Sequence, residues 1–160
     1  MLYLVQHGEA TTERENPERP LTPRGRAEVE KVADFFARSS LVRPREILHS
    51  GKRRAAETAE IFARALSLEG AVRSREGLAP NDDPEPLARE LGERPEESSM
   101  IVGHLPFLSR LASLLVAGRS EPPVVRFRMG GLVGLGREGA GWVVVALVTP
   151  EMVFSEASAG

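Results

Sequence analysis

The sequence is constrained most by short apolar runs that alternate with longer segments of helical periodicity. Runs of strand length occupy residues 2–6, 45–49 and 99–103, and apolar residues recur at helical spacing after each of them. A helix between two strands returns the chain to the starting edge of a sheet, so this order is typical of parallel strands. The last third differs, because strand-like segments at 124–135 and 142–149 are separated only by a glycine-rich stretch. The sequence therefore predicts an α/β sandwich with a mostly parallel central sheet, helices on both faces and a C-terminal antiparallel hairpin.

Local signals place the helix starts. Thr22 is a good N-cap in front of Pro23, because proline is favoured at the first helical position. Ser50 is the expected N-cap of the second long helix, and Pro106 is expected to open the last one. Two shorter elements are also predicted, a strand at 71–75 and a helix at 86–91.

Length and charge limit the functions that the chain can have. The 160 residues suffice for one ordinary domain, which we assign to residues 1–150, followed by an irregular tail at 151–160. A formal net charge of −2 gives no electrostatic argument for nucleic acid or an acidic membrane surface as a partner. The longest apolar run, Trp142–Val148, is too short to span a bilayer. The sequence does not indicate an oligomeric state.

The chain contains no cysteine, which excludes disulfides, thiolate zinc sites and cysteine nucleophiles. A cysteine-free chain fits a reducing compartment. The N-terminus also lacks the basic region and long apolar stretch of a signal peptide. We therefore expect a cytoplasmic protein.

Polar residues that suit phosphate follow three of the apolar runs. His7 ends the first run, His104 follows residues 99–103, and Ser50–Arg54 follows the second run. The carboxyl ends of parallel strands lie at one edge of a sheet, so these residues should meet there. Backbone N–H groups at a helix start and the guanidinium of Arg54 both bind anions. We expect His7, His104 and Arg54 to share one phosphate-sized cleft that leaves both imidazoles open to solvent.

Each of these residues also has a structural explanation. A histidine after a strand is more often a hydrogen-bonded structural residue than a nucleophile. Lys52 and Arg53 are expected on a solvated basic face. His49 is expected outside the cleft, because side chains alternate along a strand. Gly8 is expected to let the backbone turn tightly and approach a ligand.

Four motifs in one order carry a resemblance to a known family. They are His7-Gly8-Glu9, the segment Arg19–Gly25, the segment Ser50–Thr58 and the segment Val102–Pro106. Together they resemble the histidine phosphatase superfamily, also called the phosphoglycerate-mutase-like family. The compact length resembles its small SixA-type branch of phosphohistidine phosphatases. The likeness covers almost the whole chain, up to the terminal hairpin.

The resemblance implies a role for each matched residue. His7 matches the nucleophile that becomes transiently phosphorylated, and Arg54 matches the arginine that binds the phosphate. His104 matches the second histidine, which contacts the transferred phosphoryl group. Arg19 matches a further phosphate contact, and Gly8 belongs to the same phosphate-binding motif. The expected mechanism requires no metal and no cofactor, and no carboxylate cluster in the sequence suggests a metal.

Gln6 departs from the family pattern, which usually has arginine before the nucleophile. A glutamine amide can donate hydrogen bonds in the phosphate site but brings no charge. A hydrogen bond to a charged partner is worth about 1.5–3 kcal/mol. If such a hydrogen bond were lost only in the transition state, turnover would slow roughly ten- to hundredfold.

The predicted function is hydrolysis of a phosphorylated substrate through a phosphohistidine intermediate on His7, with protein phosphohistidine as the substrate. The segment 78–80 resembles the corresponding loop of the SixA-type branch and lacks the glutamate-bearing pattern of the mutases. A small phosphate monoester is an alternative substrate, and it would need an acid such as Glu76, Asp82 or Asp83. A phospho-ligand-binding module, with turnover weakened by Gln6, is the non-enzymatic alternative.

Overall fold

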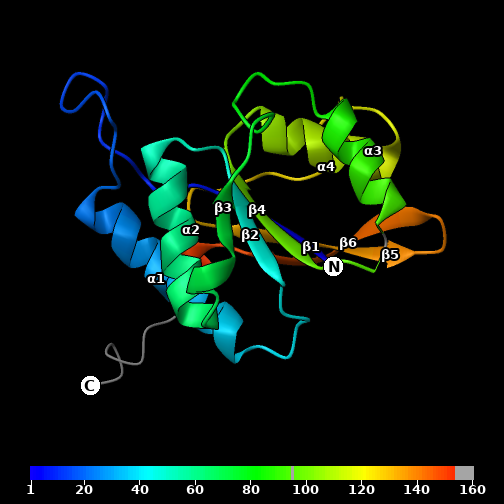
Figure 1. Ribbon diagram of the computed structural model, residues 1–160, viewed down its shortest axis with the longest axis horizontal. Coiled ribbons are helices and arrows are strands. Elements are labelled where there is room, and N and C mark those ends of the chain that lie inside the picture. The colour runs from blue at the N-terminus through cyan, green and yellow to red at the C-terminus, as the bar shows by residue number, and fades with distance from the viewer. Residues whose placement is uncertain (95, 154–160) are drawn as a thin grey trace.

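The computed structural model describes residues 1–94 and 96–153, which form one six-stranded sheet between two pairs of helices (Figure 1). The strands are β1 (Leu2–Gln6), β2 (Glu46–His49), β3 (Val72–Ser74), β4 (Ser99–Gly103), β5 (Leu132–Glu138) and β6 (Gly141–Val148). The helices are α1 (Pro23–Arg38), α2 (Arg53–Leu66), α3 (Glu85–Glu93) and α4 (Phe107–Ala117), with short 3-10 turns at Glu69–Ala71 and Pro150–Met152.

The sheet has the order β3-β2-β4-β1-β5-β6. Neighbouring strands from β3 to β1 are parallel, whereas β5 is antiparallel to β1 and β6 is antiparallel to β5. The predicted fold class is confirmed, including the mostly parallel centre and the terminal hairpin.

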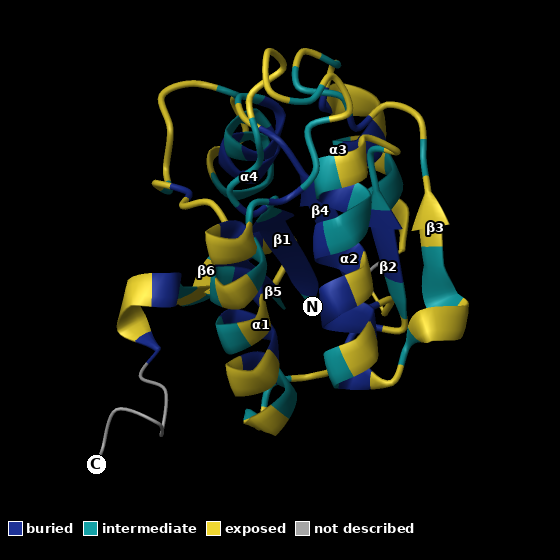
Figure 2. Ribbon diagram, turned by 90° about the vertical axis from the view of Figure 1, so that its left-hand side faces the viewer, coloured by how far each residue is buried: buried dark blue, intermediate teal, exposed yellow. Residues whose placement is uncertain are grey.

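The two faces of the sheet are covered by different helices. Figure 2 shows α1 and α2 on one side of the buried central strands, with α3 and α4 belonging to the other core. Side chains alternate along β1, so Tyr3 and Val5 pack with the α1 and α2 core while Leu2 and Leu4 pack with the α3 and α4 core. Because both faces are covered, β1 is apolar from Leu2 to Val5 rather than alternating in polarity.

The start of α1 follows the predicted capping pattern. The side chain of Thr22 accepts a hydrogen bond from the N–H of Gly25 at 2.9 Å, and Pro23 occupies the first turn. Gly25 is required for space, because a Cβ there would lie 2.1 Å from the carbonyl oxygen of Glu9. The loop after β1 therefore packs directly on the first turn of α1.

The predicted start of α2 is wrong by two residues. The helix begins at Arg53 with Lys52 as N-cap, and Ser50 lies in the preceding loop. The side chain of Ser50 is instead bonded to His104, the first residue of the loop after β4. Pro106 similarly stands at the N-cap of α4 rather than inside its first turn.

The predicted strand at 124–135 is also wrong over most of its length, because β5 begins only at Leu132. The apolar residues before it are held by a loop that packs on α4. Phe127 is buried in the core under α4, and the N–H of Val124 donates to the hydroxyl of Ser113. The expected long loop at 136–141 is correspondingly short, and its turn lies at residues 139–140.

The C-terminal region is described up to Val153, which is buried beside α1 and α2. Residues 154–160, most of the predicted tail, lie outside the described residues. No helix in the described ranges combines the length and the apolar character needed to cross a membrane.

Candidate active site

The register of β1 and β4 brings two histidines together. Gln6 pairs with Gly103 in the parallel ladder, so the next residue of each strand leaves the sheet at the same level. The backbone N–H of His7 continues the ladder by donating to the carbonyl of Gly103 at 3.0 Å. As a result the ring centroids of His7 and His104 are 5.0 Å apart, with the planes tilted by 53°.

His7 has one committed nitrogen and one available nitrogen. Its Nδ1 lies 2.7 Å from the carbonyl oxygen of Gly8. A carbonyl can only accept, so Nδ1 carries the proton and Nε2 keeps its lone pair. Burial and the charges of Arg54 and Arg19 together lower the pKa of His7 to about 4, against the opposing effect of the hydrogen bond to Gly8. His7 is therefore neutral near pH 7, as an attacking nitrogen must be.

His104 lies deeper than expected. The residue is only 2 % exposed, so the prediction that both imidazoles open to solvent is wrong for His104. Its Nε2 is 2.6 Å from the hydroxyl oxygen of Ser50, and its Nδ1 is buried with no hydrogen-bond partner among the described residues. Burial, together with the charges of His7 and Arg54, lowers its pKa to about 3. Contact between Nδ1 and a phosphoryl oxygen requires a neighbouring side chain to move.

Arg54 stands in the first turn of α2 and is half-buried. Its Nε is also a buried donor with no hydrogen-bond partner in the described part of the chain. Burial lowers the pKa of Arg54, and the nearby charge of Arg19 lowers it further. Arg54 also contributes to the lowered pKa values of His7 and His104. The guanidinium therefore acts electrostatically on the histidine pair.

Arg19 reaches the same region from the loop between β1 and α1. Its backbone has a φ of +48°, which is uncommon outside glycine and is often found at functional sites. Its Nε donates to the carbonyl oxygen of Thr11 at 3.0 Å. The charge of Arg19 lowers the pKa of both histidines and of Arg54. The two guanidiniums would both gain from an anion between them.

Gln6 and Gly8 flank the nucleophile but differ in what they offer a ligand. Gln6 is half-buried, and its Oε1 is buried without a hydrogen-bond partner among the described residues. The N–H of Gly8 already donates to the hydroxyl of Thr58 at 3.1 Å. A Cβ on Gly8 would lie 2.7 Å from Cγ2 of Val29, so this glycine is needed for packing against α1. The expected tight turn is not formed, since residues 7–9 contain neither a turn nor a bend, and the φ of Gly8 is not in the left-handed region.

Two positioning groups were missed by the sequence argument. Ser50 was expected to cap a helix and instead contacts His104. Thr58 is fully buried in α2, where its hydroxyl donates to the carbonyl of Arg54 at 2.8 Å and accepts from Gly8. A threonine on the apolar stripe of a helix is the one sequence signal for this role, because a buried hydroxyl needs partners.

The remaining charged candidates are engaged in turns or exposed. Asp82 accepts from the N–H of Ala79, and Asp83 accepts from the N–H of Glu85. Glu76 is exposed. These carboxylates serve the turns that carry them, as short acidic side chains often do.

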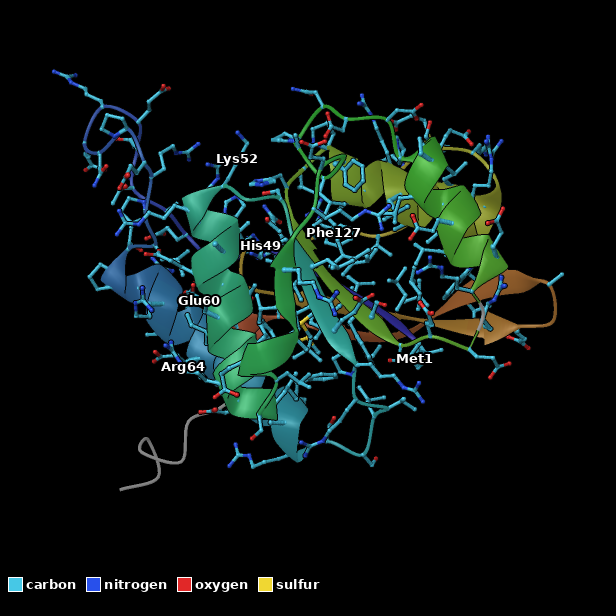
Figure 3. The ribbon with its side chains drawn as sticks, viewed as in Figure 1. Met1, His49, Lys52, Glu60, Arg64 and Phe127 are labelled. Carbon is cyan, nitrogen blue, oxygen red and sulfur yellow. The ribbon has the colours of Figure 1, made fainter. Side chains whose placement is uncertain are left out.

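His49 lies beside α2, as Figure 3 shows, and lines a cavity of about 400 Å³ with Glu60 and Arg64. Its Nδ1 accepts from the N–H of Gly51 at 3.1 Å. Lys52 and Arg53 are exposed, as predicted. Lys52 still contributes to the low pKa of His104.

Metal binding has no obvious donor set in the described ranges. No group of three histidine, cysteine, aspartate or glutamate residues is placed there to hold a metal ion. The charges that act on the two imidazoles come from arginine and lysine. This environment suits an anion.

Comparison with known proteins agrees with the motifs. Residues 2–79 match the model of the Histidine phosphatase superfamily (branch 1). No curated protein matches the chain.

Several solved structures share the fold. The protein histidine phosphatase SixA complexed with tungstate is 23% identical with a TM-score of 0.81, covering 93% of this chain and 96% of that one. SixA from Agrobacterium tumefaciens is 24% identical with a TM-score of 0.73, covering 93% and 97%. The Alpha-ribazole Phosphatase from Shigella flexneri is 17% identical with a TM-score of 0.73, covering 97% and 98%. Identities this low show the common fold. Residues 2–79 thus match the model of the histidine phosphatase superfamily, and the fold is shared with a histidine phosphatase over 93% of this chain.

Proposed function

We propose that this protein is a phosphatase that removes phosphate from protein phosphohistidine through a phosphohistidine intermediate on His7. The observation that carries the proposal is the state of His7. Its Nδ1 is committed to the Gly8 carbonyl, and its pKa is lowered to about 4. The free Nε2 therefore holds a lone pair at neutral pH, beside a second imidazole and two arginines.

The first step transfers the phosphoryl group to the enzyme. Nε2 of His7 attacks phosphorus in line, so a P–N bond forms to the enzyme as the P–N bond to the substrate imidazole breaks. The electron pair leaves with the substrate nitrogen, which takes a proton from water. Throughout this step Nδ1–H of His7 remains bonded to Gly8, which keeps the ring oriented.

The second step returns the enzyme to its starting state. A water oxygen attacks the phosphorus, the bond to Nε2 breaks, and its electron pair returns to His7. The products are inorganic phosphate and a proton released to solvent. The guanidiniums of Arg54 and Arg19, together with an N–H of His104, are the donors for the charge that develops on the phosphoryl oxygens.

The charge of the site favours a phosphohistidine substrate over a phosphate monoester. A monoester leaves as an alkoxide and benefits from a strong general acid, whereas an imidazole is a good leaving group. The charged groups that shift the pKa values of the two histidines are all cations. Asp82 and Asp83 are used in turns. The solved structures similar in fold include the protein histidine phosphatase SixA, which supports a phosphorylated protein as the partner.

The proposal is tested by trapping the intermediate. A reactive phosphodonor such as phosphoramidate should label the wild-type protein with phosphate that is labile in acid and stable in alkali. His7→Ala should abolish both the label and turnover. His49→Asn, which keeps an acceptor for Gly51 outside the site, should retain both. Turnover by His7→Ala would refute nucleophilic catalysis by His7.

Substrate assays separate the alternatives. Wild-type protein should dephosphorylate a histidine-phosphorylated carrier protein faster than p-nitrophenyl phosphate, and EDTA should leave the rate unchanged. A preference for the ester would favour the monoester alternative. Phosphate binding without any turnover would favour the binding-module alternative and overturn the proposed activity.

A further inference from the structure

We propose that Ser50 is a positioning residue that fixes the tautomer of His104, so that Nδ1–H of His104 faces the phosphoryl site. The inference rests on the proposed function for its catalytic consequence, but the tautomer itself is a property of the resting protein.

The contact arises from the order of strands in the sheet. His49 pairs with Val102 in the parallel ladder of β2 and β4, so the loop after β2 passes beside the loop after β4. Ser50 is the first residue of the loop after β2. Its hydroxyl oxygen lies 2.6 Å from Nε2 of His104. This distance is at the short end of the hydrogen-bond range.

The direction of this hydrogen bond follows from the groups around it. The Ser50 oxygen also accepts a long hydrogen bond from the N–H of Lys52 at 3.4 Å. One lone pair of the Ser50 oxygen is thus already used, and the hydroxyl proton still needs an acceptor. Unprotonated Nε2 of His104 is that acceptor. With its low pKa, His104 is neutral and carries a single ring proton. That proton must then reside on Nδ1.

The opposite tautomer would place the wrong group at the site. In that tautomer Nδ1 would be unprotonated and would carry a buried lone pair near the arginines that attract phosphoryl oxygens. The lone pair would repel those oxygens. With Nδ1 protonated, the same atom becomes a donor for them. Nδ1 has no other hydrogen-bond partner among the described residues.

His7 and His104 therefore carry the same tautomer for opposite purposes. The Gly8 carbonyl holds the proton on Nδ1 of His7 and leaves Nε2 free to attack. The Ser50 hydroxyl occupies Nε2 of His104 and leaves Nδ1–H without a partner among the described residues, so that it can donate once the side chain that covers it moves. One histidine is prepared as a nucleophile, and the other is prepared as a neutral hydrogen-bond donor.

Two other roles for Ser50 fit less well. Ser50 does not cap α2, since Lys52 is the N-cap residue. It is also poorly suited to act as a nucleophile activated by His104. A general base works best with a pKa near the operating pH, and the pKa of His104 is about 3.

Nitrogen-15 NMR of the resting protein tests the inference directly. Ring nitrogen shifts should show His104 with Nδ1 protonated in the wild type and in Ser50→Thr, which keeps the hydroxyl. Ser50→Ala should show a mixture of tautomers. Ser74→Ala, at the same edge of the sheet but exposed, should leave the His104 signals unchanged. Wild-type His104 protonated on Nε2, or an unchanged tautomer in Ser50→Ala, would overturn the inference.

Kinetics then tests the catalytic consequence. Loss of one preorganised donor typically lowers kcat by about 10²–10³. Because Ser50→Ala still populates the correct tautomer in part, we expect a kcat decrease of roughly tenfold to a hundredfold. KM should change little, and Ser50→Thr should restore kcat. An unchanged kcat with an altered tautomer would overturn the catalytic role of the tautomer. A wild-type protein without phosphatase activity would refute the proposed function. The NMR experiment alone would then decide whether Ser50 fixes the tautomer of His104.

Discussion

The backbone N–H of Gly8 donates a hydrogen bond to the side-chain oxygen of Thr58, 3.1 Å away, and ties the residue after His7 to helix α2. The same hydroxyl donates to the carbonyl of Arg54. One buried side chain thus connects the backbone next to the nucleophile with the backbone of the phosphate-binding arginine.

Thr58→Val should destabilise the protein and slow catalysis. Valine has nearly the same shape but leaves the Gly8 N–H buried and unsatisfied, which costs roughly 1–3 kcal/mol of unfolding free energy. Urea denaturation measures this loss. Thr58→Ser retains the hydroxyl and should keep most of the catalytic rate. Equal loss of kcat in the serine and valine variants would show that the hydroxyl is not what positions His7.

Gly8→Ala should destabilise the fold by about 1–3 kcal/mol, as overpacking of a core does. The new methyl group would lie 2.7 Å from Val29 Cγ2 and 3.0 Å from the carbonyl oxygen of Gly25. In the double variant with Val29→Ala, the closest clash disappears, while the contacts with the Gly25 carbonyl oxygen and with Leu21 Cδ2 remain. We therefore expect partial rescue, measured as a coupling free energy in a double-mutant cycle of thermal or urea unfolding. Additive losses would show that Val29 does not restrict this position.

The stability of the protein should fall as the pH is lowered below neutrality. Burial depresses the pKa of His7 to about 4 and that of His104 to about 3, from an ordinary value of 6.5. Between these values the unfolded chain binds protons that the folded protein does not, so protonation favours unfolding. The stabilisation is fully present above pH 6.5 and is lost as the pH falls through the folded-state pKa values. Urea denaturation from pH 7 to 4 measures the loss, which should be smaller in His7→Gln. An equal pH dependence in that variant would contradict the assignment to His7.

Gln6→Arg should raise kcat/KM on a histidine-phosphorylated protein. Gln6 precedes the nucleophile and its Oε1 has no hydrogen-bond partner among the described residues, so a guanidinium there would replace an idle acceptor with charged donors. The gain should not exceed the roughly tenfold to hundredfold that one charge-assisted hydrogen bond provides. Arg19 already lies in the region, and repulsion between guanidiniums would reduce the gain.

Whether positions 6 and 19 serve the same role in phosphate binding is decided by comparing Gln6→Arg, Arg19→Ala and the double variant. Restoration of activity in Arg19→Ala by Gln6→Arg would show that they do. A decrease in both backgrounds would show instead that glutamine is adapted to this site, and that it is not the source of a weakened activity.

The elements that were predicted correctly are those governed by local sequence. β1 follows from its own apolar run, and the start of α1 follows from Thr22 and Pro23, which are adjacent in sequence. Ser50 was assigned to the wrong role because its partner is 54 residues away and competes with its local capping preference. The segment before β5 was mistaken for a strand because Phe127 is apolar in either case. Phe127 lies in a loop and is buried because that loop packs against α4, and this packing cannot be read from the local sequence.

The position of β1 in the middle of the sheet has a consequence for folding. Strand β1 lies between β4 and β5, which begin only at Ser99 and Leu132, so β1 is synthesised long before either neighbour. The N-terminal strand must therefore wait for distant sequence before either of its edges is paired, and pairing over such separations is slow. Until then β1 is an unpaired apolar segment, which is the kind of intermediate that aggregates. His7 is made well before His104, and the two imidazoles meet only once β4 has been synthesised.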